Sequence, residues 1–346
     1  QMAGRKRQLS ETRDESPPPK RRAKTPKTPS TAGVAASTKK EWEETDERLL
    51  AITKSIMFAI GDSIEPIECN TRMLLGLMQQ QIRLIIDAAM KRANSDGRDA
   101  VTLRDLFMHF ARHKMVLGRL LHHAKAAHLV FSLSRHTKDE EEEEKEEDGV
   151  PHEAEILDHG EEEGSSSDEQ VGPLAVRASK SSTYYQLEAA IDSLQGGFRS
   201  SDLTDPSFVD LTRQARDRRM ATRVKRLRED VYKQFSEARQ ATYVSRVRQK
   251  KFNGILEGAL FISWLGLPPL DNVLTYVISW LAKEIVTQVV DDAYMCMLRE
   301  MSSGTTKRRG AAASRLTVNH YEEALRKNLG WRTKSDVLFG YIAPRE

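Results

Sequence analysis

The sequence is poor in features that mark secreted or membrane-spanning proteins. Only two cysteines occur in 346 residues, Cys69 and Cys296, and they lie too far apart to suggest a disulfide framework. No apolar run approaches the ~20 residues that cross a bilayer. The basic and polar first residues also lack the apolar stretch of a signal peptide. We therefore expect a protein of a reducing intracellular compartment, without membrane contact.

Motifs for enzyme chemistry are missing as well. The sequence has no G-x-x-x-x-G-K-[ST] phosphate loop, no H-E-x-x-H pair, no C-x-x-C and no nucleophile elbow. His122, His123 and His128 resemble metal ligands in type, but they lie among Leu and Ala at helical spacing without a nearby Cys or acid. Helix packing or solvent contact is the favoured role for them. We expect no enzyme activity, no metal and no cofactor.

Charge is nearly balanced overall but strongly segregated along the chain. The formal net charge is +3, yet residues 1–40 hold eleven Lys or Arg against three acids, and residues 139–148 read DEEEEEKEED. Blocks of like charge repel one another and stay solvated. We therefore predict a disordered basic tail over residues 1–40 and a disordered acidic linker over residues 136–182.

The basic tail contains the run PPPKRRAK, residues 17–24, in which prolines hold a basic cluster extended. Its charged residues are typical of a nuclear import signal, although similar clusters also occur in solvated tails. These residues are Lys20, Arg21, Arg22 and Lys24. We expect the protein to be nuclear.

Two stretches far apart in the chain share one pattern. In DAVTLRDLFMHFARHK, residues 99–114, and SRLTVNHYEEALRKN, residues 314–328, an apolar residue and a Thr precede an amphipathic turn. Thr102 and Thr317 are of the residue type that caps the start of a helix. The repeat indicates that one chain carries two copies of the same helical ending.

Each ending follows a long predicted helix. Apolar residues recur every three or four positions over residues 48–60 and 67–93, and again over residues 271–301. In both halves the order is short helix, long helix, short helix, and a fourth helix is expected after residue 114. The pattern predicts an all-α fold.

A single copy of this layout cannot cover its own apolar stripe. Burying one Leu or Ile is worth ~1.5–3 kcal/mol, so each copy needs a partner, and two copies in one chain can pair with each other. The predicted organisation is a disordered basic tail (1–40), a first half with an extra C-terminal helix (41–135), an acidic disordered linker (136–182), a partly ordered basic connector (183–230), a second half (231–335) and a tail (336–346).

Several runs resemble one known family, in the family's own order. Residues 57–123 are similar to the first histone-fold half of the suppressor-of-Ty three family of SAGA coactivator subunits. The runs YKQFSEARQATYVSRVRQKKF, WLAKEIVTQVVDDA and RLTVNHYEEALRKN are similar to its second half. The resemblance implies two histone folds that pair within one chain. It also implies a non-enzymatic nuclear subunit of a SAGA-type complex, which packs against other histone-fold subunits and positions the TATA-box-binding protein at promoters.

The same resemblance implies a docking residue on the second long helix. An acidic position of the family, held to contact the TATA-box-binding protein, corresponds to Glu284 within WLAKEIVTQ. Gln288 and Asp291 follow at i+4 and i+7, so the three side chains form a polar stripe beside the apolar one. We expect this stripe to be exposed, either as the docking contact or as an ordinary solvated helix flank.

Histone folds also carry an Arg before the last helix that pairs with an Asp seven residues later. Arg98 and Asp105 fit this spacing, and the alternative is two surface charges worth ~0–1 kcal/mol. In the second copy the equivalent positions are Ala313 and His320, so the pair is absent there.

The main alternative function is that of a histone-like DNA-binding protein or a subunit of the general transcription factor TFIID. Over residues 41–130, however, twelve basic residues are matched by twelve acids, whereas a phosphate-binding surface is strongly basic. The densest basic cluster is RQARDRRMATRVKRLR, residues 213–228, which is either a nucleic-acid contact or a solvated connector. We expect direct DNA binding to be weak or absent.

Overall fold

The computed structural model describes residues 31–111, 113–147, 182–194, 198–245, 251–252, 254–302, 315–328 and 338. Over these residues the fold is all-α apart from one short hairpin, as the helical periodicity predicts. The chain divides into two units, Gln1–Glu41 and Trp42–Glu346.

Four helices make up the first half of the chain. They are α1 (Thr31–Ile60), α2 (Glu68–Ser95), α3 (Leu103–Phe110) and α4 (Lys114–Glu147). Helix α1 stops where the sequence predicted, because Gly61 takes a φ of 153° that L residues rarely adopt. The long helix α2 begins one residue and ends two residues after the predicted 67–93.

Smaller elements connect the first half to the second long helix. They are α5 (Thr183–Asp192), α6 (Ser200–Thr204), α7 (Leu211–Val224), α8 (Glu229–Arg239), β1 (Lys251–Phe252), β2 (Ile255–Leu256) and α9 (Glu257–Trp264). Strands β1 and β2 pair antiparallel. The second long helix, α10 (Asn272–Ser302), lies within one residue of the predicted 271–301 at both ends, and α11 (Val318–Lys327) follows it.

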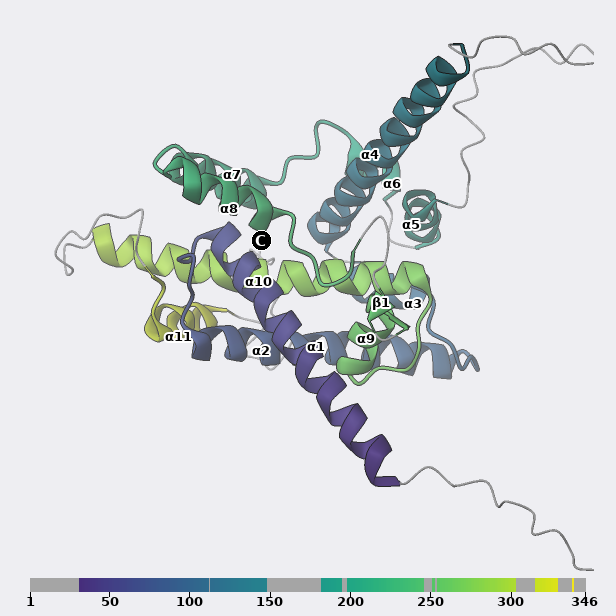
Figure 1. Ribbon diagram of the computed structural model, residues 1–346, viewed down its shortest axis with the longest axis horizontal. Helices are drawn as coiled ribbons and strands as arrows, with labels where there is room; N and C mark the ends of the chain where they lie inside the picture. The colour runs from purple at the N-terminus through teal and green to yellow at the C-terminus, as the bar shows by residue number, and fades with distance from the viewer. Residues whose placement is uncertain are drawn as a thin grey trace, which may run out of the picture. The chain divides into compact units, whose positions relative to one another are not determined.

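The two long helices form the centre of the molecule. Helices α2 and α10 lie side by side and run in opposite directions (Figure 1). Their apolar stripes meet in one core that includes Met78 and Ile82 of α2 and Leu281 and Ile285 of α10. Helix α3 packs on α2 and helix α11 packs on α10, each within its own half, whereas the contact of α2 with α10 lets each half cover the stripe of the other.

Loop contacts join the halves at two places. Near the start of α2, the Asn70 amide donates to the backbone oxygen of Leu316, just before α11, at 3.3 Å. Further along α2, Gln79 donates to the Trp264 oxygen at 2.8 Å and Arg83 to the Leu265 oxygen at 2.5 Å. Side chains of α2 therefore satisfy backbone oxygens of the second half.

The prediction of disorder over residues 1–40 is wrong for its last ten residues, since α1 already begins at Thr31. Pro29 is the last proline before the helix, and the Ala and Lys residues that follow it favour helix. Residues 1–30, including Lys20, Arg21, Arg22 and Lys24, lie outside the described part of the chain.

The prediction of a disordered linker is also wrong at its start, because α4 continues to Glu147. Glu and Lys are good helix formers, and lengthening an existing helix avoids the cost of nucleation. Residues 148–181 of the predicted linker lie outside the described residues.

The connector is more ordered than predicted. Tyr184, Leu187, Ile191 and Leu203 are buried in the main core. The first three recur at i, i+3 and i+7, but α5 is only ten residues long. One short apolar face of this kind does not produce a sustained period in the sequence.

Helix α10 corrects the expectation that no segment is long and apolar enough to cross a membrane. Its length and composition are sufficient for a membrane-spanning helix, but 83% of its most apolar stretch is buried inside the fold. Its apolar character is explained by burial between the two halves.

Candidate functional site

The polar stripe predicted on α10 lies beneath a layer of arginines. The Glu284 carboxylate accepts a hydrogen bond of 2.6 Å from Arg119 of α4, and its side chain is only 12% exposed. Arg119 also forms an ion pair with Asp210, just before α7. One guanidinium therefore links three segments: α4, the N-terminal end of α7 and α10.

Two more arginines reach the stripe from α7. Arg216 donates from Nε to Asp291 at 3.2 Å and from Nη2 to the Gln288 amide oxygen at 3.2 Å. Arg219 donates from Nη2 to both oxygens of Asp291, at 2.6 and 2.7 Å. Arg216 also lies 3.7 Å from Glu284, so arginines of α4 and α7 together neutralise the acids of the stripe.

The expectation of an exposed stripe is therefore wrong. Gln288 and Asp291 are buried, and Glu284 is largely covered. Periodicity within α10 could not reveal this, because the covering arginines come from segments more than 70 residues away. The arrangement is a buried ion-pair network. Removal of one partner from such a network strongly lowers the stability of the fold, because it leaves a buried charge unpaired.

The basic cluster over residues 213–228 is divided between two faces of α7 and the loop after it. Arg216 and Arg223 are buried, and Arg223 donates to the backbone oxygens of Phe58 at 2.8 Å and Asp62 at 2.5 Å. Arg213 and Arg218 are exposed. Much of the cluster thus makes contacts inside the protein, which the sequence analysis did not predict. The spacing of positions 216, 219 and 223 along one helical face was the sequence pattern that indicated a common buried side.

Asp292 lies next to this network, and within the described part of the chain no Lys or Arg forms an ion pair with it. Its Oδ2 accepts a hydrogen bond of 3.1 Å from the Gln288 amide. Burial raises the pKa of Asp292 to about 7, and the neighbouring charge of Asp291 adds to the rise. Gln288 therefore links the Arg216 guanidinium to the carboxylate of Asp292.

The structure brings Arg98 and Asp105 together. Two parallel hydrogen bonds of 2.7 and 2.6 Å join the guanidinium to the carboxylate, whose side chain is 5% exposed. The bonds from Arg98 hold the pKa of Asp105 well below its usual range. Asp105 also accepts from the backbone N–H of Thr102 at 2.9 Å, so the pair fixes the start of α3.

His320 occupies the equivalent place in the second half. Its Nδ1 accepts from the Thr317 backbone N–H at 3.1 Å, while its Nε2 lies 2.8 Å from a carboxylate oxygen of Glu300 on α10. The second helix start is therefore tied back to the long helix by an imidazole instead of an Arg–Asp pair.

Two of the three histidines singled out in the sequence, His123 and His128, pack against aromatic side chains. His123 lies 2.8 Å from the Tyr276 hydroxyl, and His128 stacks on Tyr184 and contacts Ser182 at 3.1 Å. Desolvation lowers the pKa of His122. Among residues whose placement is described, no group of three or more His, Cys, Asp or Glu side chains is arranged to hold a metal ion.

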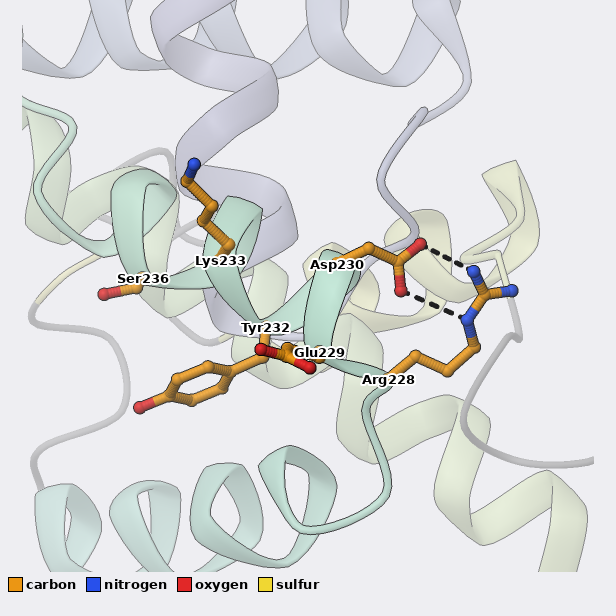
Figure 2. A pocket seen from close by; sticks show the side chains of 6 residues that line it. All are labelled: Arg228, Glu229, Asp230, Tyr232, Lys233 and Ser236. Atoms are coloured by element: carbon orange, nitrogen blue, oxygen red, sulfur yellow. Dashed lines mark hydrogen bonds and ion pairs between the residues drawn. The ribbon is translucent and has the colours of Figure 1, made fainter.

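An open hollow of about 880 Å³ lies along α8. Figure 2 shows Arg228 and Asp230 paired beside it, with bonds of 3.1 and 2.7 Å. The lining residues are Arg228, Glu229, Asp230, Tyr232, Lys233 and Ser236. All of these are exposed, so this hollow lacks the buried, convergent polar groups of a ligand site. The buried network on α10 is the stronger candidate.

Comparison with known proteins finds no related protein. No family model matches the chain, and neither a curated protein nor a solved structure does so.

Proposed function

We propose that this chain is a non-enzymatic transcription coactivator subunit of a SAGA-type complex, built from two histone folds that pair within one polypeptide. The repeated order of short, long and short helices supports this proposal, together with the runs that resemble the suppressor-of-Ty three family. The antiparallel contact of α2 and α10 is the geometry that such a pair requires.

The observation that carries the proposal is the exchange of contacts between the halves. Asn70 and Asp62 of the first half bond the backbone of Leu316 in the second. Gln79 and Arg83 bond the backbone before α10. Each half completes the other, which is expected of a scaffold and not of two independent modules.

The proposed partners are the TATA-box-binding protein and other histone-fold subunits, and the proposed location is the nucleus. The TATA-box-binding protein acts on DNA and presents basic side chains, which complement the carboxylates of α10. In the isolated chain Glu284 is paired with Arg119 of α4 and Asp291 with Arg216 of α7, so docking on both acids requires these arginines to give way.

A histone-like DNA-binding or TFIID-type role is the alternative. The exposed side of α7 favours it, since Arg213 and Arg218 face solvent there. Against it, Asp217 lies between them and 3.8 Å from Arg213, and the inward arginines are already used in ion pairs. The remaining surface is a weak match for phosphate groups.

Affinity purification of the tagged full chain from nuclear extract, followed by mass spectrometry, tests the proposal. Co-purification of coactivator subunits and the TATA-box-binding protein is the expected result. Glu65→Lys changes a charge at an exposed position, and the tagged variant should recover the same proteins as the wild-type chain. Recovery of TFIID subunits alone, or strong salt-sensitive binding of the purified chain to duplex DNA, would favour the alternative.

A further inference from the structure

Helix α7 is attached to the fold mainly through charge. Its only buried residues are Arg216 and Arg223. Met220 and Val224 add partly buried apolar contacts, whereas Leu211, at the start of the helix, is 72% exposed. A helix held in this way differs from α2 or α10, whose apolar stripes cannot leave the core without a large loss of burial.

The face of α10 beneath α7 is a preformed receptor for arginine. Asp291 is 2% exposed and accepts from two guanidinium groups at once. Gln288 extends the row by one turn toward the start of α10, and Glu284, which also bonds Arg119 of α4, extends it by two turns. The spacing of these acceptors matches two arginines three residues apart on a facing helix, as Arg216 and Arg219 are.

We propose that this face of α10 is an interaction surface for a partner helix that presents two arginines three residues apart, and that α7 occupies the surface as an internal substitute in the free chain. The inference rests on the proposed function and deepens it, by naming what controls access to the acidic contact of α10. A partner helix that replaces α7 supplies equivalent ion pairs.

Exchange of this kind avoids the usual cost of opening a buried ion-pair network. That cost arises when a buried carboxylate loses its partner and gains none. When α7 leaves, Asp291 is either hydrated or paired with the incoming arginines. The helix gives up few apolar contacts and the two hydrogen bonds from Arg223 to backbone oxygens of Phe58 and Asp62, which water can replace. Higher ionic strength should weaken the hold of α7, since its attachment is largely electrostatic.

The experiment uses the full chain and a fluorescent peptide of residues 209–226, which contains α7. The double substitution Arg216→Gln, Arg219→Gln in the chain removes the two charged side chains with which α7 binds α10. This variant should bind the peptide about tenfold more tightly than wild type, because two charge-assisted contacts become available to it. Arg213→Gln with Arg218→Gln removes the same charge from the exposed face and should bind as wild type does.

The peptide has its own matched pair. A peptide with Gln at positions 216 and 219 should lose binding to the double variant, whereas one with Gln at 213 and 218 should keep it. The two altered peptides carry equal charge, so a difference between them reports the inward arginines and not general attraction. Equal binding of both, or no gain over wild type, would overturn the proposal.

Hydrogen–deuterium exchange on the wild-type chain gives a second readout that needs no variant. Amides of α7 should exchange faster than those of α10, and a rise from about 0.05 to 0.5 M salt should speed α7 alone. Simultaneous opening of α7 and α10 would show that the arginines are fixed parts of the core. If the Arg216→Gln, Arg219→Gln variant fails to fold, this result would likewise show that the two arginines are fixed parts of the core.

These outcomes are separate from those of the proposed function. Peptide exchange without any binding of the TATA-box-binding protein would leave the surface established and reject that partner. Binding of the TATA-box-binding protein to wild type and to the double variant with equal affinity, together with no peptide exchange, would support the partner and reject the role of α7.

Discussion

The Tyr321 hydroxyl donates a hydrogen bond of 2.9 Å to Oδ2 of Asp62, although 259 positions separate the two residues in the chain. Both side chains are buried. The other oxygen of Asp62 accepts from the backbone N–H groups of Leu316 at 2.9 Å and Ser63 at 2.7 Å. Burial raises the pKa of Asp62, so these donors stabilise an acid that is otherwise costly in the core. The loop after α1 is thereby joined to the start of α11.

Tyr321→Phe should lower the free energy of unfolding by about 1–3 kcal/mol, because it keeps the ring but leaves a buried carboxylate oxygen without its donor. Urea denaturation followed by circular dichroism measures the change. Tyr232→Phe is the control, since Tyr232 is 50% exposed. Equal losses in the two variants would contradict the importance of the Asp62 contact.

Gly61→Ala should be strongly destabilising. A Cβ at this position would lie 2.8 Å from the Tyr294 ring, and the φ of 153° is unfavourable for alanine in any case. Gly76, within α2, has nothing within 4 Å of its added Cβ, so Gly76→Ala should stabilise by about 0.5–1 kcal/mol. Thermal melting of the two variants should move in opposite directions. Stabilisation by Gly61→Ala would show that the Tyr294 ring does not approach this position in solution.

Glu284→Lys should cost about 3–5 kcal/mol of stability, because it places a third positive charge beside Arg119 and Arg216 and breaks a covered network. The comparison is Glu65→Lys, which makes the same change of charge at an exposed position. Chemical denaturation of both proteins at one salt concentration measures the difference. A near-neutral Glu284→Lys would mean that Arg119 and Arg216 do not cover this position in solution.

Asp292 should make stability depend on pH. Its pKa is about 7 in the fold against 3.8 for an ordinary Asp, so between these values the folded state holds more protons than the unfolded state. Stability from this group is therefore present below about pH 4 and is lost as the pH rises toward 7. Asp292→Asn should stabilise the protein more at pH 8 than at pH 5, by roughly 1 kcal/mol or more. Denaturation of wild type and variant at both pH values tests this, and a pH-independent difference would refute it.

Local features of the chain were largely predictable from sequence. Thr102 and Thr317 each stand at the N-cap of a short helix, and α10 follows its apolar period within one residue at each end. Helix starts and periods depend on neighbours within a few positions, which is why one sequence is enough to find them. The spacing of Arg98 and Asp105 was visible for the same reason.

The candidate site was not predictable in the same way. The sequence placed Glu284, Gln288 and Asp291 correctly on one stripe of α10, and helical geometry alone determined that alignment. Only the tertiary structure decided whether the stripe faces water, because Arg119, Arg216 and Arg219 come from α4 and α7. A charge pattern within one helix specifies which side chains share a face, whereas burial depends on segments that are distant in sequence and meet only when the chain is folded.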